Sequence, residues 1–591
     1  MKRLSLVVAL SVVCSIPAFS QAPAPGAPRP GLPTPTGAQA PGLPPRDNRA
    51  AQPQTGTALI RGRVVAAQTG QPLRRAQITL ASSAAPTGLR RSTTTDGEGR
   101  FEFKELPAGT FSLTANKTGY VNLQYGQRRP FEQGTPIPLA DGQVLEKVDF
   151  SLPRGGVIVI RVSDDFAEPI AGAQVQIQRY QYQADGQRRL STVQSGISGL
   201  AMTDDRGELR GYGLMPGEYI VSASLRALGA PGASNDAGEG FSPTFFPGVI
   251  NADQAVPVSI RVGEEATAQF SLIASRLSRL SGIVVDSEGR PVAGAALSMV
   301  TRTATSMSSS GAGVTGPDGS FTIGGVSPGD HSIDVRPRPV LGATGGGEYA
   351  SLPVTVGGAD ITGLRIVTGA GALVSGRVVF EGGAAPADGA TRRVMLQQAD
   401  PSRQMAMVGL TDSQRNGTLD ADGRFEIAGA AGRVFFNVNA AVPAPTVAAW
   451  NIKSVTLDGR NITDEPLELS GRTSVSDVSI TMTDKQTTVS GQVGDGRGQV
   501  LRDYVVVILP AEDKEPVIAA RYIRTVRPNI DGRFETRGLR PGRYVATAIE
   551  ALEQGRQFAP EFQGQLRRGA REFTVGEGQS VTLDLRLTPD L

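Results

Sequence analysis

The sequence predicts an all-β protein, organised as a tandem array of about five β-sandwich domains. Glycine and proline are abundant, with 73 and 41 among 591 residues, which favours many turns over long helices. One turn-and-strand pattern recurs five times at a nearly constant spacing. Short runs of alternating apolar and polar residues surround each copy, and no window has the period of a long amphipathic helix.

The recurring pattern is an Asp- and Gly-rich turn with a strand after it, then Pro-Gly or Ala-Gly and a second strand. In the first copy these parts are residues 95–103 and 106–113. The Asp-Gly pair favours a tight hairpin turn because Gly accepts a positive φ and Asp can bond the turn backbone. The first apolar residues after the turns lie 104 to 112 positions apart, which indicates homologous domains: Phe101, Leu209, Phe321, Phe425 and Phe534.

Further strands precede and follow this pattern in each copy. The first copy opens with a short apolar strand at residues 62–65 and continues through a turn into a second strand within residues 70–80. Most copies close with a strand of period two, at residues 148–152, 268–272, 478–482 and 581–585. Short strands, Gly/Pro turns and units of about 100 residues are typical of β-sandwiches.

The ends of these patterns predict the domain limits. Residues 1–20 are typical of a secretory signal, with Lys2 and Arg3 before an apolar stretch and cleavage near Ser20–Gln21. Residues 21–57 are rich in Pro, Ala, Gly and Gln and are expected to form a disordered tether. The β-sandwiches are expected at residues 58–154, 155–275, 276–370, 371–485 and 486–591.

The signal predicts export to the periplasm, the outer surface or the exterior. No later apolar run reaches the roughly 20 residues that span a bilayer, so we expect no membrane span in the mature chain. The last closing strand runs almost to Leu591, and we expect no C-terminal anchor.

Composition excludes several classes of function. The chain has one His, one Cys and one Trp, too few for a zinc site of several His or Cys, a disulfide framework, or a nucleophile–histidine pair in each domain. We therefore expect no enzyme, no catalytic residues, no cofactor and no metal. The formal net charge is only +3, and the arginine pairs at 128–129 and 567–568 are expected to be solvated, so nucleic acid is not an expected partner.

The first copy resembles the carboxypeptidase regulatory-like domain, a transthyretin-like sandwich. The resemblance lies in Gly-x-Pro-Leu-x-x-Ala-x-Ile at 70–78, Thr-Asp-x-x-Gly-x-Phe at 95–101 and Leu-Pro-Ala-Gly-x-Phe at 106–111. It implies immunoglobulin-like or transthyretin-like sandwiches, as in bacterial repeat proteins where such domains are stalk, scaffold or binding modules. It does not imply peptidase activity, which carboxypeptidases place in a separate zinc domain.

An insert of the fourth copy, residues 450–467, also resembles segments of such bacterial repeat proteins, and its Asp-Gly-Arg-Asn core is expected to be a turn between two strands.

The sequence does not favour an isopeptide bond or a calcium site. An intramolecular isopeptide bond, as in adhesin-type relatives, needs a Lys on an early strand, and no Lys lies on an opening strand. Acidic turns such as residues 420–423 offer oxygen ligands for calcium, but turn geometry explains their carboxylates.

His331 follows a Pro-Gly where other copies have Tyr, Phe or Val, and is expected to be a half-buried strand residue.

We interpret the chain as a secreted, non-enzymatic scaffold or binding protein of the cell envelope or exterior, with its domains end to end as a semi-rigid rod. The expected partner is an unknown protein or polysaccharide of the envelope or exterior. The alternatives are an accessory subunit of a secreted enzyme or transporter, and a carbohydrate-binding protein that uses aromatic loops. The candidate ligand-binding aromatic residues, for which internal packing is the competing interpretation, are Trp450, Tyr180, Tyr182, Phe245 and Phe246.

Overall fold

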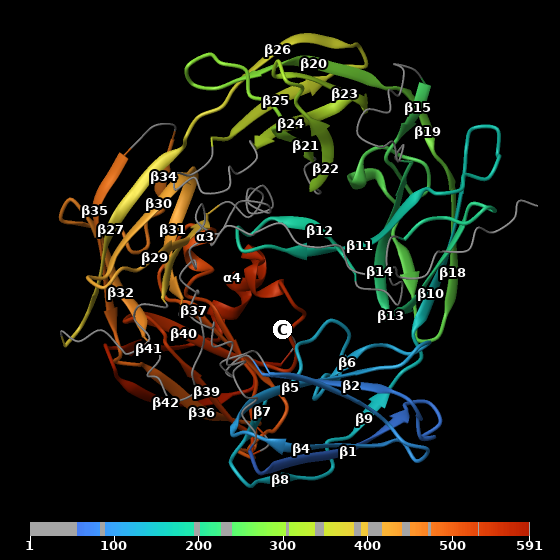
Figure 1. The fold of residues 1–591 in the computed structure, drawn as a ribbon. Helices are drawn as coiled ribbons and strands as arrows, with labels where there is room; N and C mark the ends of the chain where they lie inside the picture. The colour runs from blue at the N-terminus through green and yellow to red at the C-terminus, as the bar shows by residue number, and fades with distance from the viewer. Residues whose placement is uncertain are drawn as a thin grey trace, which may run out of the picture. The chain divides into compact units, whose positions relative to one another are not determined.

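In a computed structural model of the chain, the regular secondary structure of the described residues is almost entirely β-strand (Figure 1). The structure describes residues 56–82, 89–193, 201–225, 239–302, 307–336, 348–382, 392–399, 416–439, 450–470, 474–529 and 531–589. Residues 54–591 form one compact unit. The predicted signal, and all of the predicted tether but its last two residues, lie outside the described ranges.

The first sandwich shows the arrangement that the others follow. In one sheet, β1 (Ala58–Ala66) pairs antiparallel with β4 (Arg100–Leu106) and parallel with β8 (Val144–Leu145) and β9 (Phe150–Leu152). In the other, β2 (Gln77–Ser82) lies between β3 (Arg90–Thr94) and β5 (Gly109–Asn116), and β5 also pairs with β6 (Leu123–Gln124) and β7 (Ile137–Leu139). Alternate apolar side chains of both sheets form the core, because successive side chains of a strand point to opposite faces.

The first sheet recurs with the same pairing in four later groups of strands. The opening strands are β10 (Gly156–Ser163), β20 (Ser278–Val285), β27 (Ala372–Phe380) and β36 (Thr488–Gly494). Their antiparallel neighbours are β13 (Glu208–Leu214), β23 (Ser320–Val326), β30 (Arg424–Ala430) and β39 (Arg533–Arg537). Their parallel neighbours, the closing strands, are β18 (Glu265–Ser271), β26 (Ile361–Val367), β35 (Ser474–Thr483) and β42 (Ser580–Arg586).

The second sheet recurs in the same way. The second group contributes β11 (Gln174–Tyr182), β12 (Arg188–Thr192), β14 (Gly217–Ser224), β16 (Thr244–Phe245) and β17 (Val258–Ile260). The third contributes β21 (Ala296–Arg302), β22 (Met307–Val314), β24 (Gly329–Arg336) and β25 (Ala350–Val356). The fourth contributes β28 (Arg393–Gln398), β29 (Asn416–Thr418), β31 (Gly432–Asn439) and β34 (Leu467–Leu469). The fifth contributes β37 (Val505–Pro510), β38 (Arg524–Val526), β40 (Gly542–Ile549) and β41 (Arg571–Val575).

Each group has a main apolar core of its own. The chain is therefore a tandem array of β-sandwiches, as predicted, and we propose the domain limits given above for the five that these strand groups form. Two additions extend the plan. β15 (Glu239–Ser242) pairs with β19 (Ile273–Arg276) in the second group. In the fourth, the insert forms β32 (Asn451–Leu457) and β33 (Arg460–Asn461), and β32 pairs with β35. A turn joins the two strands as expected, but it comprises only Asp458 and Gly459, whereas Arg460 and Asn461 of the expected turn are strand.

The recurring turn ends in a glycine that stands three residues after an Asp in the first, second and fourth copies, after Gly316 in the third and after Asn529 in the fifth. In the first copy, Asp96 Oδ1 accepts the backbone N–H groups of Glu98 (3.0 Å) and Arg100 (2.8 Å). Gly99 has a φ of +75°, whereas Gly97 does not have a positive φ, so the prediction that the glycine directly after Asp adopts a positive φ is wrong for this copy. The equivalent glycines of the other copies also have φ of 68–80°: Gly207, Gly319, Gly423 and Gly532.

The fifth sandwich carries a helix that the sequence did not predict. α4 (Pro560–Arg568) begins with a proline at its first turn, where a missing N–H costs nothing. Its buried Phe562 and Leu566 pack on the outer face of β37 and β40. The strand β37 is buried along its whole length because cores cover both of its faces. A shorter helix, α3 (Pro516–Ala519), precedes β38.

Candidate functional site

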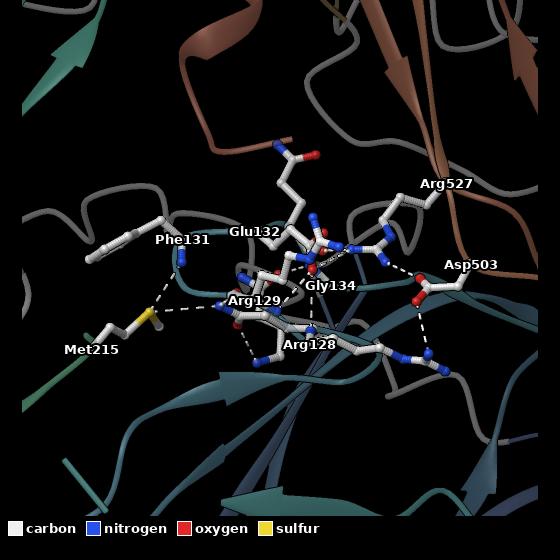
Figure 2. Close-up of polar contacts among 11 residues, drawn as sticks. Arg128, Arg129, Phe131, Glu132, Gly134, Met215, Asp503 and Arg527 are labelled. Carbon is white, nitrogen blue, oxygen red and sulfur yellow. Dashed lines mark hydrogen bonds and ion pairs between the residues drawn. The ribbon is translucent and has the colours of Figure 1, made fainter. Parts of the chain in front are cut away.

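A loop of the first sandwich reaches two other sandwiches. This bridging loop, residues 125–136, connects β6 to β7 (Figure 2). Its Glu132 is buried, with a side chain only 3% exposed. Glu132 Oε2 accepts the backbone N–H groups of Arg128 and Arg129 at 3.2 Å each and lies 3.3 Å from Nη1 of Arg527, which belongs to the fifth sandwich. The loop is therefore folded around a carboxylate that faces another domain.

Arg527 lies just after β38 and is buried against the bridging loop, with a side chain 6% exposed. Its Nη1 also donates to the carbonyl oxygen of Gln133 at 2.7 Å, and its Nη2 donates to Asp503 Oδ1 at 2.9 Å. The other oxygen of Asp503 pairs with Nη1 of Arg128 at 2.8 Å. Charges of the two sandwiches thus alternate in one connected network (Figure 2). Such a network depends on its geometry, because a buried charge that loses its partner is strongly destabilising.

The same loop contacts the second sandwich through Phe131. This residue has a φ of +60°, which is uncommon for residues other than glycine. The Phe131 N–H points to the sulfur of Met215 at 3.3 Å, and its ring meets Tyr219 edge-on at 6.4 Å between centroids. The guanidinium carbon of Arg179 lies 3.6 Å from the centroid of the Phe131 ring. Burial lowers the pKa of Arg179 below its ordinary value, as expected for a cation removed from water.

The second and fifth sandwiches also contact each other at this junction. Arg179 forms an ion pair with Glu553 of the fifth sandwich. An isolated β-bridge joins Glu553 to Glu132, and the carbonyl oxygen of Phe131 accepts the N–H of Gln554 at 3.0 Å. We call this three-domain contact, formed by the bridging loop, Arg179 and the Asp503, Arg527 and 550–554 positions of the fifth sandwich, the triple junction.

The triple junction contradicts the expected rod. In a rod each sandwich touches only its neighbours along the chain, whereas here the fifth sandwich contacts the first and the second. The arginine pairs at 128–129 and 567–568 were expected to be solvated, but three of these four side chains also make contacts with protein groups. Arg128 and Arg129 remain exposed but pair with Asp503 and Glu550 of the fifth sandwich, and Arg567 Nη1 donates to the carbonyl oxygens of residues 510 and 511.

The aromatic candidates lie in several places, and none is highly exposed. Phe245 is buried in β16, and half-buried Tyr180 packs against the same small cluster, with its hydroxyl donating to the carbonyl oxygen of Ala252 at 3.3 Å. Tyr182 packs instead against the outer core of the fifth sandwich. Phe246 meets Phe270 edge-on at 6.2 Å. In the fourth sandwich, Trp450 meets Phe380 edge-on, with centroids 4.9 Å apart.

The repeat pattern and composition of the sequence do not predict the triple junction. The partners of residues 125–136 lie up to 423 positions away in the chain, so no spacing within the segment predicts them. One signal was available in retrospect: Phe131 and Glu132 stand within a run of Gln, Arg and Gly. An apolar ring in such a loop needs a surface to cover it.

Within the described ranges, no group of three or more His, Cys, Asp or Glu side chains is placed to hold a metal ion. Among the helices of that part of the chain, none has the length and apolar character needed to cross a bilayer.

Comparison with known proteins confirms the resemblance for the first sandwich: residues 59–153 match the family model of the carboxypeptidase regulatory-like domain. No curated protein sequence matches the chain. Among solved structures, GBS52, the minor pilin of Streptococcus agalactiae, is 14% identical, with 36% of this chain and 95% of that chain covered and a TM-score of 0.21. A streptococcal ancillary pilin is 12% identical, with coverages of 53% and 98% and a TM-score of 0.19. The TIE protein of Bacillus anthracis is 10% identical, with coverages of 89% and 73% and a TM-score of 0.14. Scores this low say nothing about the function of this chain.

Proposed function

We propose that this chain is an exported, non-enzymatic scaffold of the cell envelope or exterior, and that it presents loops from several sandwiches to a protein partner. The observation that supports the proposal is the buried ionic contact of Glu132 and Arg527 in the triple junction. Such contacts add little stability compared with apolar packing, but they can specify one arrangement of the parts they join. A surface composed of several domains keeps its form only when the domains are fixed to one another.

The alternatives have less support. Carbohydrate binding by the aromatic loops requires free ring faces, whereas Phe245 is buried and Trp450 packs edge-on against Phe380. The face of Tyr180 is covered by Arg188, with the guanidinium carbon 4.3 Å from the ring centroid. No specific contact favours an accessory subunit of an enzyme or transporter over a scaffold.

The experiment is a pull-down with residues 21–591 against the cell-envelope fraction of the source, before and after protease digestion of that fraction. We expect saturable capture that digestion abolishes. The variant Arg527→Met, which leaves Glu132 buried without its partner, is expected to reduce capture severalfold. The matched control is Arg210→Met, which removes an exposed ion pair with Glu265 inside the second sandwich and should change nothing.

Two results would contradict the proposal. Capture that survives protease digestion would assign binding to an envelope polysaccharide instead of a protein. Equal capture by Arg527→Met and the original chain would show that the fixed arrangement of the domains has no part in partner binding.

A further inference from the structure

A cavity of about 550 Å³ opens where the fourth and fifth sandwiches meet. The insert of the fourth sandwich forms one wall, with Asn451, Lys453 and Asn461. The fifth sandwich forms the other, with Tyr522 and Arg540. Small-molecule sites in proteins commonly have volumes of about 300–1,000 Å³ and lie between domains. We call this cavity the insert cleft.

Direct contacts between the two sandwiches hold the walls of the insert cleft in place. Asp464, which follows β33, accepts hydrogen bonds from the Tyr522 hydroxyl and from Nη1 of Arg540. Arg521 Nη1 donates to the carbonyl oxygen of Thr463 at 3.1 Å. The cleft is therefore largely formed before any ligand arrives, which lowers the cost of ordering a site on binding.

The charged groups of the cleft neutralise one another. Lys453 Nζ pairs with Glu577 of the fifth sandwich at 2.9 Å and with Glu381 of the fourth. The hydrogen bond from Lys453 holds the pKa of Glu381 at about 2. Arg540 is paired with Asp464, and burial raises the pKa of Tyr522 to about 12, so that this phenol stays neutral. Of the other charged residues that line the cleft, Lys485 lies with its Nζ 4.0 Å from Glu577, and Glu465 pairs with Arg460. Three cations and three anions therefore line the cleft, which leaves little net charge to attract a charged ligand.

The groups left without protein partners are neutral. In the described part of the chain, no hydrogen bond to a protein group is found for the Asn451 amide, the Ser454 hydroxyl or Nδ2 of Asn461, although all three residues line the cleft. An amide offers both donors and an acceptor, and a hydroxyl can serve as either. Such groups match a ligand whose own hydroxyls also donate and accept.

From this chemistry we propose that the insert cleft binds a neutral, hydroxyl-rich ligand, a short oligosaccharide, through the Asn451, Ser454 and Asn461 side chains. The paired charges around them position these groups and reject charged analogues, because an ionic ligand would have to displace an existing partner. The site does not depend on the triple junction, and it differs from the aromatic loops in both residues and chemistry.

The test is isothermal titration of residues 21–591 with neutral cello-, xylo-, malto- and chito-oligosaccharides, and with acidic oligogalacturonides. We expect at least one neutral series to bind and the acidic one not to bind. Asn451→Leu should weaken that binding about tenfold or more, since it removes hydrogen bonds and leaves ligand hydroxyls unpaired. Asn437→Ala changes an amide outside the cleft lining, bonded to Gln397 at 2.6 Å, and serves as the matched control.

Three results would overturn the proposal: no binding of any neutral oligosaccharide at millimolar concentration, tighter binding of the acidic series, or equal binding by Asn451→Leu. Tyr180→Ala separates this site from the aromatic loops, because it should leave the titration unchanged. Capture by the cleft should survive protease digestion of the envelope fraction and be lost in Asn451→Leu, whereas capture of protein should be lost on digestion and survive Asn451→Leu. Failure of the insert cleft and failure of the scaffold proposal are therefore distinguishable.

Discussion

At the scale of single residues, a glycine on the opening strand sets how closely the closing strand approaches. A Cβ on Gly62 would lie 1.9 Å from the carbonyl oxygen of Val148 and 2.7 Å from the ring of Phe101. Equivalent close contacts surround the glycines of the third, fourth and fifth copies, Gly282, Gly376 and Gly491. In the second copy the position is Ile160, opposite Leu209. In this copy the opposing strand has the smaller Leu209 where the first copy has Phe101, and this accompanies the larger Ile160 on the opening strand.

Gly62→Ala is therefore expected to destabilise the first sandwich, by roughly 1–3 kcal/mol if the backbone can shift to accommodate the methyl group. Peptide-resolved hydrogen exchange measures this domain by domain, which matters because a chain of several domains does not unfold in two states. Exchange in β1 and β4 should accelerate. Gly97→Ala is the control, because it has free space around it and no positive φ. Equal exchange in the two variants would contradict the packing argument.

His331 shows what sequence alone could and could not predict at this scale. Its place on a strand after Pro-Gly is confirmed, but it is only 5% exposed, more deeply buried than expected. Its Nε2 lies 2.8 Å from the carbonyl oxygen of Ser327, four residues earlier, just as the hydroxyls of Tyr219 and Tyr544 reach carbonyls four residues before them. Because a carbonyl only accepts, Nε2 carries a proton, and Nδ1 lies 2.9 Å from the Thr301 hydroxyl. The repeat predicts the position of His331 on a strand, but its contact with the carbonyl oxygen of Ser327 is known only from the structure.

At the scale of elements, strands were predictable and the helix was not. Each strand is bounded by a turn with a physical cause, such as the Asp96 carboxylate and Gly99, and alternation distinguishes its two faces. α4 has only nine residues, too few to display a helical period, and its stability comes from tertiary packing on β37 and β40. The apolar run of β37 is buried on both faces in the structure, and this run is not among the predictions made from the sequence.

Leu566→Ala tests that packing directly. Leu566 is fully buried on the face of α4 that packs against β37 and β40, so its truncation should cost about 2–5 kcal/mol of the stability of this layer. We expect faster hydrogen exchange in α4 and along β37, and in the Tyr182 segment that packs on the same cluster. Glu561→Ala, an exposed position in the first turn of the helix, should have little effect. Protection of α4 that is the same in both variants would show that Leu566 does not hold the helix.

At the scale of the whole molecule, the sequence orders the domains along the chain but does not reveal contacts between distant ones. Repeats predict that units are alike, and local patterns predict what each unit buries within itself. The contact of Glu132 with Arg527 joins residues 395 positions apart, and neither residue is unusual in its own segment. Both are polar residues in connections, where the usual expectation is exposure to water.

The contact of the first and fifth sandwiches can be measured through the distance between two spin labels. The only cysteine, Cys14, lies in the predicted signal, so labels can be placed at Thr69→Cys and Arg497→Cys, two exposed turn positions. A single narrow distance distribution is expected. Arg527→Met should broaden it, because removing one partner of a buried ion pair costs about 3–5 kcal/mol, and separation of the two surfaces would let water reach the Glu132 carboxylate.

The double variant Glu132→Leu with Arg527→Met distinguishes loss of charge from loss of contact. Replacing a buried ion pair with apolar side chains of similar size is often neutral or stabilising, so the narrow distribution should return in part. Labels at Thr69→Cys and Asn116→Cys, both within the first sandwich, should report one distance in every background. A broad distribution in the unmodified chain would mean that the first and fifth sandwiches are not held together in solution, and the scaffold would then have to act without a fixed composite surface.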